Sequence, residues 1–162
     1  MSRTSWWIGP YRAVRDWVQG RHLAEDTRAL QGSIRSAQVR AIQSPGTLHE
    51  LEFRVFSQFG DDGILQWLVS HLPGIPRTFV EFGVEDYTEA TTRFLLVNDN
   101  WSGLVMDGSE RNISRLRNRP WFWRYDLTAL PRFLTRTNVD SEIGRWLDGR
   151  ELGLLHIDVD GN

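Results

Sequence analysis

The sequence predicts an α/β fold in which helices cover both faces of a parallel sheet, preceded by an N-terminal helical arm. Two observations carry this prediction. After residue 46, short apolar segments alternate with stretches of helical periodicity, and a carboxylate lies near the end of each apolar segment. Strands that alternate with helices pair in parallel, and their right-handed crossovers bring the carboxyl ends to one edge. The segments expected to be strands are residues 78–82, 103–107, 121–125 and 152–157.

The composition excludes several kinds of chemistry. The chain of 162 residues is long enough for one domain, and it has no cysteine, which excludes disulfides and thiolate nucleophiles. All 19 basic residues are arginine, so the chain offers neither a Schiff-base lysine nor a P-loop lysine. The net charge of −2 gives no general attraction to nucleic acid. Because no apolar stretch approaches the roughly 18 residues of a membrane span and no signal-peptide pattern is present, we expect a soluble cytoplasmic protein.

The N-terminal arm, residues 1–43, has the apolar spacing that is typical of helices. Pro10 suits a first helical turn, and the Ser-Pro-Gly run at residues 44–46 ends the arm. We expect its second apolar stripe to pack on the chain's own domain, with dimerisation or partner binding as the alternative. The sequence thus divides into a helical arm, residues 1–46, and an α/β domain, residues 47–162. The stripe consists of Leu23, Leu30, Ile34, Ala37 and Ala41.

Helices are expected around the strands. Acidic residues suit the first turn of the earliest one. Ser109 is a suitable cap for the third, which Pro120 ends, and Gly149 lies just past the end of the last. The expected helices are residues 61–72, 88–97, 110–119 and 140–148.

The acids near the strand ends are the strongest functional signal. A carboxylate at the end of the second strand can accept both ribose hydroxyls of a nucleoside, through charged hydrogen bonds that contribute about 1.5–3 kcal/mol each. We therefore interpret Asp107 as a nucleoside ligand, although Asp-Gly-Ser is also acceptable turn chemistry there. In strand order, the acids expected at the common edge are Glu81, Asp107, Asp126 and Asp158, with Asp160 in the loop beyond.

Two of these acids have alternative interpretations. Asp126 could accept a hydrogen bond from an adenine amino group, or it could cap the segment that follows it. Glu81 is interpreted as a site residue because it precedes the glycine that a cofactor loop needs. It could instead be a buried acid that pairs with an arginine such as Arg93.

The loop after the first strand discriminates between nucleoside cofactors. A dinucleotide site needs Gly-x-Gly-x-x-Gly so that the backbone can approach a pyrophosphate closely. Here only Gly83 is present, and Glu85 and Asp86 follow it. These carboxylates would repel a pyrophosphate but would accommodate the sulfonium and ammonium groups of S-adenosylmethionine. The loop therefore disfavours NAD.

Several stretches of the sequence resemble the FkbM-like branch of class I S-adenosylmethionine-dependent methyltransferases. They are FRVFSQFGDDGIL at residues 53–65, FVEFGVEDYTEATTRFLL at 79–96, WSGLVMDGSERNI at 101–113 and LLHIDVDGN at 154–162. The resemblance implies a Rossmann-like fold and O-methylation of a hydroxyl on a glycan, a lipid or a related metabolite. The loop after Gly83 lacks the further glycines of many relatives.

The resemblance also implies roles for individual residues. The methionine end of the cofactor would contact Glu81 and Gly83, and its amino-acid group would be within reach of Ser57 and Gln58. The ribose would bind Asp107, and the adenine would lie near Asp126. The methyl group and the acceptor would face Asp158 and Asp160.

Transfer of a methyl group to an alcohol requires removal of the hydroxyl proton. Asp160 is the first candidate for the general base, either directly or through a divalent cation such as Mg²⁺, with Asp158 as a second ligand. His156 lies on the same strand, and we interpret it as a core histidine whose hydrogen bonds are satisfied.

Other functions remain open at the level of sequence. A class I methyltransferase continues beyond its fourth strand, so we expect the truncated, cofactor-binding half of the fold, with an open sheet edge that could pair with another copy or a partner. A non-catalytic domain that binds cofactor or a partner is the main alternative. A weaker one is an Asp-x-Asp-Gly phosphatase that uses Mg²⁺, based on residues 158–161.

Overall fold

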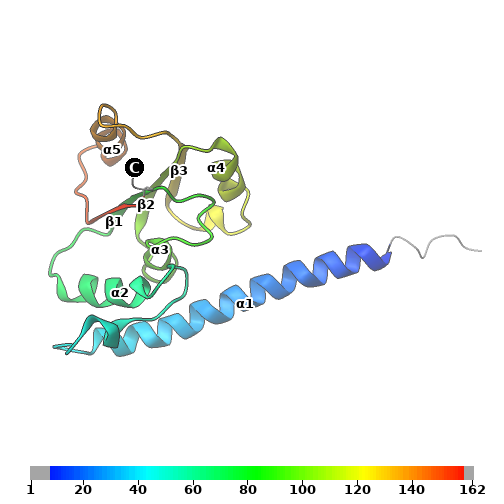
Figure 1. Cartoon of the computed structure of the whole chain (residues 1–162), viewed down its shortest axis with the longest axis horizontal. Helices are drawn as coiled ribbons and strands as arrows, with labels where there is room; N and C mark the ends of the chain where they lie inside the picture. Colours follow the sequence, from blue (N-terminus) through cyan, green and yellow to red (C-terminus); the bar gives the residue numbers. More distant parts are fainter. Residues whose placement is uncertain (1–7, 159–162) are drawn as a thin grey trace, which may run out of the picture.

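The computed structural model describes residues 8–158, with side chains described from residue 23 onward. Helices and strands alternate along most of the chain (Figure 1). The helices are α1 (Ile8–Arg40), α2 (Asp61–His71), α3 (Arg93–Asp99), α4 (Glu110–Arg117) and α5 (Val139–Leu147), with 3-10 turns η1 (Leu48–Leu51) and η2 (Phe122–Arg124). The strands are β1 (Thr78–Phe82), β2 (Ser102–Asp107), β3 (Leu127–Pro131) and β4 (Leu154–Ile157).

The strands form one sheet in the order β3-β2-β1-β4, and every neighbouring pair is parallel. This arrangement confirms the predicted α/β fold of Rossmann-like type. The chain builds outward from β1 to β3 and then returns to the other side of β1. In such sheets, ligands bind outside the carboxyl ends of the strands where the order reverses, which here is between β1 and β4.

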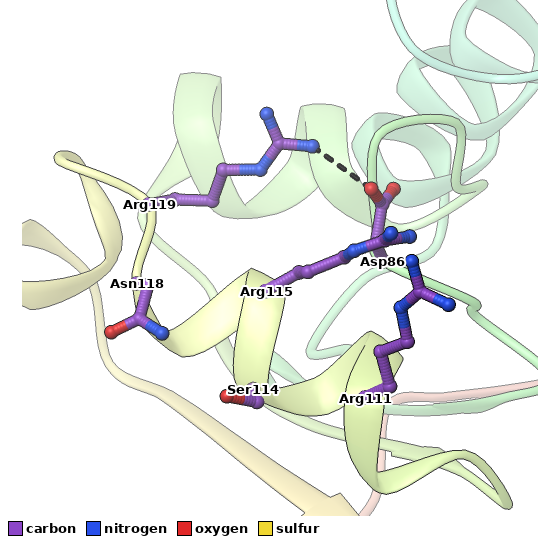
Figure 2. A pocket seen from close by; sticks show the side chains of 6 residues that line it. All are labelled: Asp86, Arg111, Ser114, Arg115, Asn118 and Arg119. Carbon is purple, nitrogen blue, oxygen red and sulfur yellow. Dashed lines mark hydrogen bonds and ion pairs between the residues drawn. The ribbon is translucent and has the colours of Figure 1, made fainter.

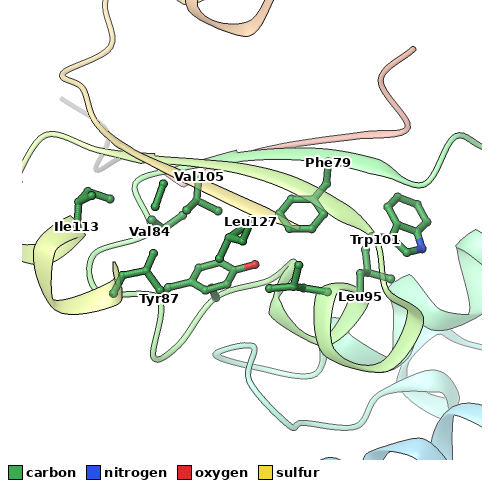
Figure 3. Packing of buried hydrophobic residues seen from close by; sticks show 12 residues of the cluster. Phe79, Val84, Tyr87, Leu95, Trp101, Val105, Ile113 and Leu127 are labelled. Carbon is green, nitrogen blue, oxygen red and sulfur yellow. The ribbon is translucent and has the colours of Figure 1, made fainter. Parts of the chain in front are cut away.

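Helices cover both faces of the sheet, as predicted. The residues of β1 alternate between the faces, so Phe79 and Val80 belong to different core clusters. Helices α3 and α4 cover the face that includes Phe79, and Figure 3 shows part of that cluster. Helix α5 covers the other face, where Ile143 and Trp146 pack against the cluster that contains Val80.

The third strand lies further along the chain than predicted. Residues 121–125 contain the turn η2 (Phe122–Arg124), and the strand that pairs with β2 is Leu127–Pro131. The aromatic run has high β-propensity, but Trp121, Phe122 and Tyr125 pack against the core from the turn instead. As a consequence, Asp126 precedes β3 and lies at the amino-terminal edge of the sheet, where it accepts a hydrogen bond from the Ser102 hydroxyl.

The described part of the arm is mostly the single helix α1, but the face that packs on the domain is not the predicted stripe. The stripe residues Leu23, Leu30 and Ile34 are 68%, 65% and 57% exposed, whereas Gly32 and Val39 are buried. A Cβ on Gly32 would overlap side chains of the domain, so this glycine allows close approach. The expectation that the stripe packs on the domain was therefore wrong. Among the described residues, none of the helices combines the length and apolar content needed to cross a bilayer.

A partly buried ion pair joins the arm to the rest of the chain. The Arg93 side chain is 4% exposed, and its guanidinium donates to the Glu25 carboxylate of α1. The same guanidinium lies 4.1 Å from the centre of the Phe56 ring. Arg93 therefore does not serve as the partner of Glu81, which was the alternative considered for that acid.

Candidate functional site

A hollow of about 810 Å³ lies at the carboxyl edge of the sheet, beside the point where the strand order reverses. Its walls come from the segments that follow all the strands, together with a residue of α4 and residues of two loops. The residues around it are Gln58, Phe82, Gly83, Val84, Glu85, Glu89, Met106, Asp107, Gly108, Asn112, Arg132, Phe133, Leu134 and Asp158. Of the predicted site residues, Gln58, Gly83, Asp107 and Asp158 therefore meet here.

Asp107 connects three segments at this hollow. One carboxylate oxygen accepts from the Ser109 amide at 2.8 Å and from the Asn112 side chain at 3.3 Å. The other oxygen accepts from the Glu85 amide at 2.9 Å. An ionised carboxylate has about four acceptor positions, and three are used here, so the partly exposed Asp107 can accept one more hydrogen bond. Asp107 is thus both the turn residue and a possible ligand for hydroxyl groups.

Gly83 allows β1 and β4 to approach each other at their carboxyl ends. Its φ of 84° lies in the left-handed region, and a Cβ built on it would lie 1.4 Å from the Asp158 carbonyl oxygen. Next to it, the Asp158 amide donates to the Phe82 carbonyl at 3.0 Å. The predicted glycine is therefore required by strand packing, and it also lines the hollow.

The loop between β1 and α3 is held in a strained conformation. Glu85 and Tyr87 have positive φ values of 48° and 59°, although neither is glycine. Tyr87 is fully buried, its hydroxyl is 2.8 Å from the Thr92 hydroxyl, and burial raises its pKa well above the usual value. Such residues persist only where the surroundings determine the backbone, which is common at functional sites.

Glu81 supports this loop and does not line the hollow. It is 1% exposed, and its carboxylate accepts from the Thr91 amide at 3.0 Å and from the Thr92 amide at 3.1 Å. Because these amides bond to Glu81, residues 88–92 form loop where a helix was expected, and α3 begins at Arg93. Glu81, which was predicted to contact the cofactor, is therefore buried on the face of the sheet that α3 covers, and the predicted contact stays untested.

His156 is a further partner of Glu81. Its Nδ1 lies 3.0 Å from a Glu81 oxygen, but its side chain is 32% exposed, so His156 is bonded through one ring nitrogen and is not the core histidine that the sequence predicts. The hydrogen bond to Glu81 raises the pKa of His156, and the negative charges of Glu81 and Asp158 add to it, against the opposing effect of burial. The imidazolium is therefore stabilised beside a buried carboxylate.

The predicted pair Ser57 and Gln58 separates in the structure. Ser57 is fully buried, and its hydroxyl lies 3.0 Å from a carboxylate oxygen of Asp62. The same oxygen of Asp62 accepts from the amides of residues 55–57. Ser57 therefore orders the segment before α2, and only the exposed Gln58 reaches the hollow.

The sequence reasoning missed the residues that follow β3. Because the strand was placed six residues too early, Asp126 was assigned to the carboxyl edge, where the structure has Arg132 and Phe133 instead. The Phe133 ring is 78% exposed at the wall of the hollow, and a Cβ on Gly108 would lie 3.1 Å from it. A correct register for β3 would have identified this aromatic residue.

Of the two acids that the sequence assigns to metal binding and catalysis, one lies within the described residues. Asp158 is exposed and lines the hollow, whereas Asp160 lies outside the described residues. Within residues 23–158, no three histidine, aspartate or glutamate side chains are grouped closely enough to hold a metal ion.

The charges around the hollow are mainly negative. The carboxylates of Glu85, Glu89, Asp107 and Asp158 face it, against the single guanidinium of Arg132. Glu89 is partly neutralised by Arg54 at 3.1 Å, and Arg132 lies 3.5 Å from Glu142. The remaining excess of acid favours a neutral or cationic ligand over a polyphosphate.

Comparisons with protein-family models, with curated proteins and with solved structures give no match for this chain.

Proposed function

We propose that the chain binds S-adenosylmethionine in the hollow at the carboxyl edge of the sheet and takes part in methyl transfer to a hydroxyl group, as its FkbM-like sequence segments suggest. One observation carries the proposal: a partly exposed carboxylate, Asp107, ends β2 within an acid-rich hollow beside the reversal of strand order. Rossmann-like sheets bind nucleosides in this position.

Ribose binding would use the remaining acceptor capacity of Asp107. Its existing hydrogen bonds fix the carboxylate against the Glu85 amide and the start of α4, so its orientation is set before a ligand arrives. A preorganised acceptor loses little freedom on binding, which favours affinity. Three of about four acceptor positions are already occupied, so the free one can take one of the two vicinal hydroxyls of a ribose.

The base of the nucleoside would lie against Phe133. This ring is exposed at the wall of the hollow, on the segment after β3. Stacking of a base on an aromatic side chain contributes about 1–3 kcal/mol. Phe133 thereby replaces Asp126 as the residue proposed to contact adenine.

The acid excess supports a sulfonium cofactor. S-adenosylmethionine, when bound, supplies a methyl group on a positively charged sulfur. Glu85 and Asp158 lie on the loops after β1 and β4, and their charges favour that cation and a ligand ammonium group. A nicotinamide dinucleotide would place its pyrophosphate among the same carboxylates, at an unfavourable energy.

The role of base is proposed for the acids that follow β4. A hydroxyl acceptor needs a carboxylate that takes its proton as the new carbon–oxygen bond forms. Asp158 is exposed at the hollow and is suitably placed on the described part of the chain. Asp160, the first candidate from the sequence, remains a prediction.

Calorimetric titration with S-adenosylmethionine and S-adenosylhomocysteine tests the proposal. Asp107→Asn keeps the shape of the side chain but removes its charge, and we expect it to weaken binding about 10- to 100-fold, as the loss of charged hydrogen bonds predicts. Asp126→Asn is the matched control, because it makes the same change at the opposite edge. Equal affinity of the parent and Asp107→Asn, or no binding by a folded parent chain, would contradict the proposal.

A further inference from the structure

The outer side of α4 borders a second hollow, of about 510 Å³, that is separate from the site described above (Figure 2). Arg111 and Arg115 are one helical turn apart on α4, and Arg119 follows at the same spacing just beyond the helix. Residues four apart share one face of a helix. Figure 2 shows Arg111 and Arg115 extending toward Asp86, to which Arg119 is bonded. Ser114 and Asn118 complete the lining.

The charges in this hollow are unbalanced. Arg119 lies 3.2 Å from the carboxylate of Asp86, which neutralises one guanidinium. Arg111 and Arg115 make no hydrogen bond or ion pair with another side chain among residues 23–158, and both are exposed. Three cations thus surround one anion, in a chain whose net charge is −2.

Asp86 is already committed to its ionised form. Burial would raise the pKa of this carboxyl, but the hydrogen bonds from Thr88 and the charges of Arg119 and Arg115 lower it below the usual value. Because this carboxyl group is already ionised, it cannot neutralise more of the surrounding positive charge by losing a proton. The positive excess beside it is available to a ligand.

We propose that this hollow binds a phosphate group in its dianionic form. Two unpaired guanidiniums can each offer a fork of parallel N–H donors to phosphate oxygens, which is the geometry that makes arginine a phosphate ligand. Ser114 and Asn118 line the same hollow with uncharged side chains, so they add no negative charge there. Like charges four residues apart destabilise a helix slightly, and a bound dianion removes that repulsion.

This inference does not rest on methyl transfer, since the two hollows share no lining residue. They lie on different sides of α4, where Asn112 faces one and Ser114 the other. The phosphate could belong to a soluble phosphomonoester or to the headgroup of an anionic lipid such as phosphatidic acid. The chemistry of recognition is the same for both sources.

Binding of inorganic phosphate to the full chain, at constant ionic strength, is the first test. We expect saturable binding by the parent chain, measured by NMR or by the rise in the unfolding temperature. The double variant Arg111→Gln/Arg115→Gln should lose affinity for phosphate about tenfold or more. Arg77→Gln/Arg136→Gln removes the same charge from exposed positions elsewhere and should leave affinity unchanged. Equal loss in both double variants, or no saturable binding by the folded parent chain to phosphate or to the vesicles described next, would overturn the proposal.

Vesicle flotation distinguishes the two sources. Vesicles of phosphatidylcholine with phosphatidic acid present phosphomonoester groups, and vesicles with phosphatidylglycerol at the same surface charge present only diesters. Binding to the phosphatidic acid vesicles that depends on Arg111 and Arg115 indicates a lipid headgroup, whereas binding to phosphate alone indicates a soluble ligand. Equal binding to both kinds of anionic vesicle, without affinity for phosphate, would show general attraction to negative surfaces and would overturn the proposal of a phosphate site.

Discussion

Replacement of Gly83 by alanine tests the close approach of β1 and β4 that shapes the candidate site. The added Cβ would lie 1.4 Å from the Asp158 carbonyl oxygen, whereas ordinary contact begins near 3.4 Å, so the two backbones must separate by about 2 Å. The hydrogen bond from the Asp158 amide to the Phe82 carbonyl, now 3.0 Å long, would then break. The substitution therefore acts on strand pairing as well as on the backbone conformation of residue 83.

The magnitude follows from three effects. A left-handed conformation costs a non-glycine residue about 1–2 kcal/mol. Forced overlap in a packed region costs about 1–3 kcal/mol, and a lost backbone hydrogen bond about 1 kcal/mol. Reduced freedom of the unfolded chain offsets about 0.4–1 kcal/mol. We expect Gly83→Ala to lower the free energy of unfolding by about 2–5 kcal/mol.

Gly74→Ala is the matched control for this experiment. Gly74 has a similar φ of 74°, but a Cβ there would have no neighbour within 4 Å. It should show only the conformational cost, about 1 kcal/mol after the offset from the unfolded chain. Urea denaturation followed by tryptophan fluorescence measures both variants. If they lose the same stability, the contact between Gly83 and Asp158 does not exist as described.

Two further predictions concern pH and the arm. The pKa of His156 is raised in the folded chain, so native protein binds more protons than unfolded protein between the unfolded pKa, near 6.5, and the folded pKa. Its stabilising contribution is therefore complete below pH 6.5 and is lost as pH rises through the folded pKa. Urea denaturation at several pH values should show that the free energy of unfolding of the parent chain declines over this range. The decline should be smaller in His156→Gln. On α1, Leu30→Gln at an exposed position should change stability by less than about 0.5 kcal/mol, whereas Val39→Ala, at a buried one, should lower it by about 2 kcal/mol. The opposite order in urea denaturation would mean that the predicted stripe packs on the domain after all.

The strands that the sequence predicted correctly are those whose residue pattern fits only one kind of secondary structure. The runs at residues 78–82 and 103–107 are apolar, short and bounded by turn residues, and only a buried strand satisfies that combination. The end of β2 was therefore correct, and Asp107 was placed at the proper edge. The aromatic run at residues 121–125 can be buried equally well by a strand or by a turn, so the register of β3 and the position of Phe133 could not be deduced.

The arm illustrates a second limit of sequence reasoning. Large apolar side chains usually identify the buried face of a helix, yet here they are exposed, and the buried residues are Gly32, Ser36 and Val39. Gly32 permits close approach, and Ser36 donates to the buried side chain of Gln66. Close packing with paired polar groups can replace apolar area, and it leaves no periodic hydrophobic signal.

Two carboxylates together explain why the candidate site can exist before any ligand binds. Asp107 holds the amide of Glu85 near the start of the loop after β1, and Glu81 holds the amides of Thr91 and Thr92 near its end. With both ends fixed, the loop retains its positive φ values at Glu85 and Tyr87, which an unrestrained loop would relax. The two acids thus have complementary roles. Glu81, inside β1, secures the loop to the helix layer, and Asp107, at the end of β2, secures it at the hollow. A ligand that enters the hollow meets a backbone already ordered, and little of its binding energy is needed to order it.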